Sequence, residues 1–179
     1  MRTIKGLALG LIIGLAVTTG TADGRKAITI LDECDPADQA LWAPTGGCAL
    51  DDGDVGFAEF QAMRFSPLAL STIGHMAWRT DPTYLRIEPN KTIKVTNEGG
   101  RGHTFTEVAN FGGGMVPPLN QGLTPAPECG DAGVIAATAL DPGEGLELKE
   151  LPEGDHRFMC CIHPWMRTQI KVAAKHGND

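Results

Sequence analysis

The sequence predicts an all-β fold, either a sandwich or a barrel, and three observations support this. Short stretches after residue 83 alternate apolar and polar side chains, which is typical of half-buried strands. Glycine and proline together supply 35 of the 179 residues, and this excess favours turns over long helices. Hydrophobic residues make up 42% and charged residues 21%, as in a packed globular chain, and the length fits one domain or two small ones.

The first 22 residues have the pattern of a secretory signal peptide. Arg2 and Lys5 precede an apolar run over 6–17, and small residues follow up to Ala22. The run is short for a membrane span, and an uncleaved anchor is the alternative. Cleavage after Ala22 would change the net charge from −7 to −9, because two basic residues are lost. We therefore expect a periplasmic or secreted protein with no membrane span after processing, in a compartment that permits disulfides.

The mature chain divides into an irregular part and a strand-rich part. We expect residues 23–79 to form an N-terminal extension, packed on a domain that spans 80–179. Within the extension, the patterns predict a strand at 26–31 and a short helix in 54–65 with Asp54 as its N-cap. The other predicted strands are 84–88, 92–96, 103–108, 146–150, 156–160 and 168–172, with a Gly- and Pro-rich insertion at 110–134.

Cysteine, histidine and methionine occur together in the segment 160–166, whose sequence is Cys-Cys-Ile-His-Pro-Trp-Met. The segment lies between two predicted strands, so it forms a loop that can direct Cys160, His163 and Met166 toward one point. Two imidazoles and a thiolate in a plane, with a weak axial thioether, are the ligands of a blue copper site. The second imidazole must come from elsewhere, and His103 is the best candidate because it begins a strand after a Gly-rich loop.

Other interpretations use the same residues. Zinc prefers closed sets of Cys and His, to which a Met ligand is foreign. A catalytic Cys–His pair needs a base beside an activated thiolate, and it leaves Met166 without a role. Cys161 could replace Cys160 as the ligand. Taken one at a time, Cys160 could be a half-cystine, Met166 a core residue and His163 a surface histidine.

The segment 160–167 resembles the C-terminal copper loop of cupredoxins of the amicyanin and plastocyanin type, with a spacing most similar to amicyanin and tighter than plastocyanin. Residues 97–105 resemble the strand that carries the first histidine ligand in this family. Thr104 departs from the pattern, because an Asn usually follows that histidine. The resemblance covers roughly residues 80–174.

This resemblance implies a Greek-key β-sandwich with one type 1 copper ion bound by His103, Cys160, His163 and Met166. It implies a carrier of single electrons rather than an enzyme, with His163 as the more exposed ligand. The alternative is a copper carrier or storage protein that delivers metal, which His75, Met76 and Met115 would serve. Thr104 would hydrogen-bond within the site either similarly to the usual Asn or less firmly.

The resemblance also implies a transient redox partner and a monomer. An acidic chain favours a basic partner and argues against nucleic acid, because binding to phosphates requires a basic face. Pro164 and Trp165 would either form an apolar docking patch beside His163 or pack in the core.

Five cysteines leave one sulfur outside intramolecular disulfides. With Cys160 as the metal ligand, we expect disulfides between Cys34 and Cys48 and between Cys129 and Cys161. Three histidines are not expected to bind the metal: His75 is expected to be structural, His156 to be a solvated turn residue, and His176 to lie in the polar tail. Glu107 is also not expected to bind, although its carboxylate would be an alternative axial ligand.

Overall fold

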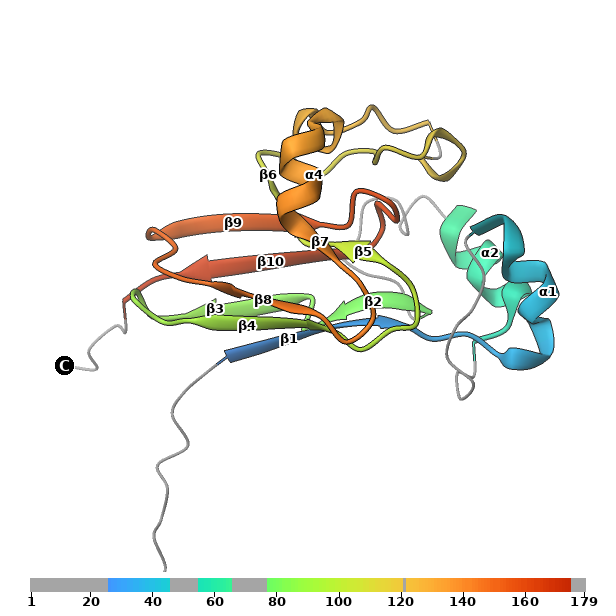
Figure 1. Ribbon diagram of the computed structural model, residues 1–179, viewed down its shortest axis with the longest axis horizontal. Coiled ribbons are helices and arrows are strands. Elements are labelled where there is room, and N and C mark those ends of the chain that lie inside the picture. The colour runs from blue at the N-terminus through green and yellow to red at the C-terminus, as the bar shows by residue number, and fades with distance from the viewer. Residues whose placement is uncertain (1–25, 46–54, 66–76, 121, 175–179) are drawn as a thin grey trace, which may run out of the picture.

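Two four-stranded sheets face each other in the computed structural model, which describes residues 26–45, 55–65, 77–120 and 122–174 (Figure 1). The first sheet has the order β2 (Trp78–Asp81), β1 (Lys26–Asp32), β4 (Ile93–Asn97) and β8 (Gly145–Leu148). The second has the order β3 (Tyr84–Ile87), β10 (Arg167–Val172), β9 (Gly154–Met159) and β6 (Thr106–Val108). A short ribbon pairs β5 (His103–Thr104) with β7 (Ala139–Leu140).

The sheets are held together by the apolar side chains that alternate along their strands. Ile28 and Ile30 of β1 are buried, and so are Phe158 of β9 and Ile170 of β10. The parallel pairs β1–β4 and β3–β10 join strands that are distant in sequence. The chain must therefore cross between the two sheets to connect them, as in a Greek key. The predicted β-sandwich is confirmed.

Most predicted strands are present within one or two residues of their expected bounds. The exception is the single strand expected at 103–108, which is split at Phe105 because the chain changes partner there. The residues before it pair with β7, those after it pair with β9, and the Phe105 N–H donates to the Thr138 carbonyl (2.9 Å). The strands β2 and β7 were not predicted.

The segment expected as an extension contributes an inner strand to the sandwich. β1 lies between β2 and β4, with a parallel register to β4 that pairs Ile28 with Val95. The boundary between residues 79 and 80 stays a prediction. The expected signal peptide and Asp54, Cys48, His75, Met76 and His176 lie outside the described residues.

Short helices collect at the end of the sandwich where β9 and β10 are joined (Figure 1). They are η1 (Pro36–Asp38), α1 (Gln39–Trp42), η2 (Ala43–Thr45) and α2 (Phe57–Phe65), the last within the predicted range. Asp38 Oδ2 accepts the N–H of Phe57 (2.8 Å), so a carboxylate from η1 satisfies the first turn of α2. Trp42 and Phe60 are fully buried and continue the sandwich core into this end.

The insertion between β6 and β7 contains η3 (Pro117–Leu119), η4 (Pro127–Gly130) and α4 (Ala132–Thr138). Asp131 caps α4 by accepting the N–H groups of Gly133 (2.8 Å) and Val134 (3.1 Å). The predicted Cys129–Cys161 disulfide is confirmed, and it ties η4 to the loop after β9. The insertion thus braces that loop.

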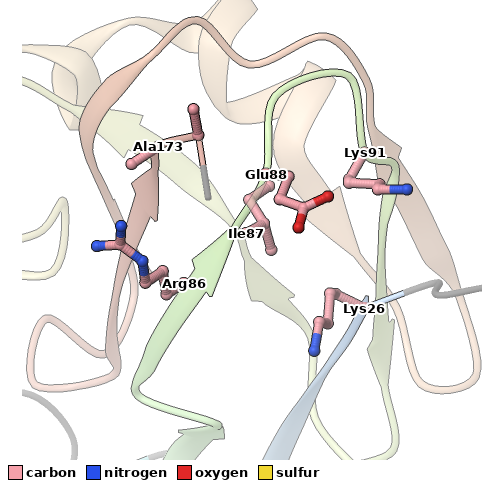
Figure 2. A pocket seen from close by; sticks show the side chains of 7 residues that line it. Lys26, Arg86, Ile87, Glu88, Lys91 and Ala173 are labelled. Carbon is pink, nitrogen blue, oxygen red and sulfur yellow. The ribbon is translucent and has the colours of Figure 1, made fainter. Parts of the chain in front are cut away.

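A hollow of about 430 Å³ lies at the other end of the sandwich (Figure 2). Its lining comes from the start of β1 (Lys26), the end of β3 (Arg86, Ile87, Glu88) and the residues after β10 (Ala173), together with Lys91. These positions are a strand length away from Asp32 and Cys160. Within the described residues, no helix is long and apolar enough to cross a membrane.

Candidate metal centre

The loop between β9 and β10 is closed on itself by two backbone hydrogen bonds. The Cys160 N–H donates to the Met166 carbonyl (3.0 Å), and the Met166 N–H donates to the His163 carbonyl (2.9 Å). Arg167 Nε adds a bond to the Pro164 carbonyl (2.6 Å). These bonds place the predicted ligands of this loop in one tight turn at the end of the sandwich.

His103 reaches the same end of the sandwich from β5. The preceding loop is organised by the buried Asn97, whose Nδ2 donates to the carbonyls of Arg101 (2.7 Å) and Leu140 (2.9 Å). His103 also pairs with Leu140 in the β5–β7 ribbon. Its backbone is therefore held on both sides.

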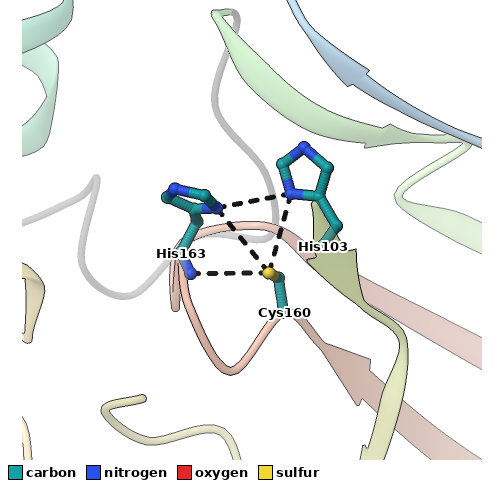
Figure 3. Close-up of side chains that lie close together, drawn as sticks. All are labelled: His103, Cys160 and His163. Atoms are coloured by element: carbon teal, nitrogen blue, oxygen red, sulfur yellow. Dashed lines mark hydrogen bonds between the residues drawn. The ribbon is translucent and has the colours of Figure 1, made fainter. Parts of the chain in front are cut away.

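Figure 3 shows that one nitrogen of each imidazole and the thiol sulfur face one another. Cys160 Sγ lies 3.7 Å from Nδ1 of His103 and 3.7 Å from Nδ1 of His163, and the two nitrogens are 3.3 Å apart. All three residues are buried. The structure therefore brings together three of the four predicted ligands.

The triangle has the size that a single metal ion requires. The point equidistant from its three corners lies about 2.1 Å from each atom, close to the lengths of metal bonds to imidazole nitrogen and thiolate sulfur. Met166, the fourth predicted ligand, is fully buried. It is the last residue of the loop that also carries Cys160 and His163. A set of two imidazoles, one thiolate and one thioether suits copper better than zinc.

Two backbone N–H groups point at the sulfur. Thr104 donates to Cys160 Sγ from β5 (3.4 Å), and His163 donates to it from within the loop (3.5 Å). Thr104 also accepts the N–H of Cys161 through its hydroxyl (2.8 Å). Thr104 thus links the two ligand-bearing segments directly, as expected for the residue in the place of the usual Asn.

The three side chains also perturb one another electrostatically. Burial opposes charge on both His103 and Cys160, but hydrogen bonding outweighs it. Bonds to Asp32 and Cys160 raise the pKa of His103 to about 9. The two imidazoles hold the pKa of Cys160 well below its ordinary value. This shift favours the thiolate, which is the form that binds a metal.

An aromatic cap, made of Trp42, Phe57, Phe60, Trp78 and Trp165, covers His163. Trp78 contacts the imidazole edge-on with ring centroids 4.3 Å apart, and Trp165 lies at 5.6 Å. Phe60 packs against Trp165 at 5.6 Å, and Trp42 packs against Phe60 at 4.6 Å.

This cap decides between the two expectations for Pro164 and Trp165, because both residues are buried and form no apolar docking patch beside His163. His163 is only 3% exposed and Trp165 only 5%: Trp78 packs against the imidazole, and Phe60 of α2 packs against Trp165. Trp165 therefore belongs to the core, which was the alternative. The sequence contained no signal that the helical segment would cover this loop.

The remaining candidates lie apart from the triangle. Cys161 is in a disulfide, which excludes it as the thiolate ligand, and Cys34 is also disulfide-bonded, although its expected partner is not described. Among the cysteines that the structure describes, Cys160 is the free one. The expectation of a solvated His156 was wrong: it lies on β9, where Nδ1 meets Glu107 Oε1 (2.7 Å). That contact engages Glu107 as well.

Asp32 is a residue of the site that the sequence did not reveal. It ends β1 and is fully buried, with its Oδ2 3.3 Å from Nε2 of His103. The local sequence Asp32-Glu33-Cys34-Asp35 offers three carboxylates and contains no motif that marks one of them as part of a site. The signal that could have identified it is alternation, because Asp32 lies two residues after the buried Ile30 and therefore faces the same side of the sheet.

Three solved structures of known proteins are similar to this chain over part or most of its length. A purple cupredoxin from Nitrosopumilus maritimus is 20% identical, with 55% of this chain and 86% of that chain covered and a TM-score of 0.37. An oxidised amicyanin variant is 13% identical, with 87% and 88% covered and a TM-score of 0.40. A reduced amicyanin variant is 18% identical, with 51% and 70% covered and a TM-score of 0.34.

The chain is similar to cupredoxins. No family model matches the chain, and no curated protein matches it. The likenesses in structure are distant, so the assignment of a metal to the site depends on its own donor atoms and their spacing.

Proposed function

We propose that this protein is an exported type 1 copper protein that carries single electrons between redox partners. The observation that supports it most directly is the buried triangle of Cys160 Sγ and the two Nδ1 atoms, which has the donor chemistry and size for one copper ion. Copper bound there would supply a Cu(I)/Cu(II) couple. Met166 would be the weak axial ligand.

The surroundings of the triangle suit electron transfer better than catalysis. His103, Cys160 and His163 are each at most 3% exposed, so a substrate has no direct access to a metal between them. The donors are held by β5, by a closed loop and by a disulfide on the next residue. Such a rigid site suits a reaction in which only an electron is exchanged, because little rearrangement accompanies it.

Burial also argues against the alternative of a protein that delivers copper. A donor set beneath an aromatic cap would release its metal slowly. Incubation of the copper-loaded protein with a chelator tests this: retention over the time of many redox cycles supports the electron carrier, and rapid transfer supports the copper carrier.

The deciding experiment is the visible spectrum of the copper-loaded, oxidised protein. We expect a strong thiolate-to-copper charge-transfer band that disappears on reduction and is absent in Cys160→Ser. Met166→Leu should keep the band but change the reduction potential, whereas the exposed Met115→Leu should change neither. An oxidised wild type that binds copper without this band would overturn the proposal.

The partner is expected to be a basic redox protein, because the chain has a net charge of −7 and −9 without its predicted signal peptide. Electrostatic steering would make the association rate fall as ionic strength rises. A rate that does not depend on salt would contradict this part of the proposal. We also propose that the protein acts as a monomer.

A further inference from the structure

The carboxylate of Asp32 lies behind His103, on the side away from the sulfur. Its Oδ1 accepts the N–H of Gly100 (2.9 Å), and its Oδ2 accepts the N–H of Arg101 (2.9 Å) and lies 3.3 Å from His103 Nε2. The side chains of Asp32 and His103 are both fully buried. These contacts join β1 to a residue 71 positions later in the chain.

The loop that contains Gly99, Gly100 and Arg101 leaves space for this carboxylate. A Cβ on Gly99 would lie 2.7 Å from Asp32 Oδ2, closer than real side chains approach, so only glycine fits there. The Gly99 backbone is fixed by its own N–H bond to the Ile30 carbonyl (3.1 Å). The loop thus wraps around the carboxylate with its N–H groups pointing inward.

This arrangement decides which ring nitrogen of His103 keeps its proton when the ring is neutral, as it must be to bind a metal. Each Asp32 oxygen already accepts a backbone N–H, so the carboxylate meets the ring as an acceptor and Nε2 must donate. Nδ1, which faces Cys160 Sγ and His163 Nδ1, then keeps its lone pair for a metal. Among the described residues, no carboxylate forms a corresponding pair with His163.

The geometry points to Asp32 as a positioning residue that fixes the tautomer of His103 and, through its buried negative charge, lowers the reduction potential of the copper site. This inference rests on the proposed function. A carboxylate that accepts from a metal-bound imidazole makes the ring a stronger donor. A stronger donor and a nearby anion both favour the more highly charged Cu(II) state, and the effect is large where water is excluded.

The test compares Asp32→Asn with Glu98→Gln, both loaded with copper. Glu98 is an exposed residue of the same loop, so its variant removes one charge that water already screens. For Asp32→Asn we expect the redox equilibrium to shift about tenfold toward Cu(I), equivalent to about 59 mV, and copper affinity to fall about 10–100-fold. Glu98→Gln should match the wild type in both. An Asp32→Asn protein whose potential equals that of Glu98→Gln would show that the carboxylate only braces the loop.

A second measurement uses the unmodified protein, in case Asp32→Asn does not fold. Nitrogen-15 NMR of the diamagnetic Cu(I) form should show the His103 ring proton on Nε2, with Nδ1 unprotonated. A proton on Nδ1 would overturn the inference. Failure of the proposed function and failure of the role of Asp32 give different results. A wild type without the thiolate-to-copper band refutes the proposed function. A wild type that has the band but carries the His103 proton on Nδ1 refutes only the role of Asp32.

Discussion

Replacing both Cys129 and Cys161 with alanine should lower the free energy of unfolding by about 3.7 kcal/mol. The two cysteines are 32 positions apart, so their disulfide closes a loop of about 33 residues in the unfolded chain, and the chain-entropy relation converts that length into this value. Alanine is preferred because serine would bury a hydroxyl at two positions that are almost fully buried.

Urea unfolding of the metal-free protein, followed by tryptophan fluorescence, measures the change. Ala136→Ser, at an exposed position of α4 inside the closed loop, is the control and should cost at most about 0.7 kcal/mol. The copper-loaded double variant should keep its charge-transfer band, since neither cysteine belongs to the donor triangle. A loss below about 1 kcal/mol would refute the reasoning, because it would mean that the disulfide does not restrict the unfolded chain as its loop length requires.

Three further predictions concern the surroundings of the site. Gly114→Ala should cost about 1–3 kcal/mol of stability in urea unfolding, because the added Cβ would overlap a backbone carbonyl of the β9–β10 loop, whereas Gly130→Ala, with open space around it, should cost far less. Phe60→Ala, in the centre of the aromatic cap, should cost about 3–5 kcal/mol, and an unchanged midpoint would show that the cap does not pack as described. Burial lowers the pKa of His156, but the Glu107 bond outweighs this and raises it, so the pair stabilises the fold below pH 6.5 and loses its effect as pH rises through the folded pKa. NMR titration should therefore find a lower His156 pKa in Glu107→Gln, and an unchanged pKa would contradict that cause.

The parts of the site that could be predicted are those encoded locally. Cys160, His163 and Met166 fall within one short loop, and a loop between two strands has few ways to arrange its side chains. His103 could be added because a Gly-rich turn precedes it at the start of a strand. Their approach to one another follows from strand alternation and turn chemistry, which a single sequence displays.

The parts that could not be predicted depend on contacts between distant segments. Asp32 meets His103 across 71 positions, and whether it faces the site depends on the register of β1 against β4, which no local pattern specifies. The split of the predicted strand at Phe105 likewise reflects a change of partner between two sheets. The outer part of the aromatic cap, Trp42 and Phe60, comes from helices that are short and have little periodicity of their own.

The aromatic cap separates the proposed copper ligands from the surface that a partner would touch. An electron that enters or leaves on this side would have to tunnel through the rings of Trp78 and Trp165 instead of passing directly from an exposed imidazole. The outer wall of that barrier, which includes the exposed Leu41 of α1, comes from a segment that contributes no ligand. Changes in this segment could therefore alter the choice of partner and the transfer rate while the potential of the metal stays the same.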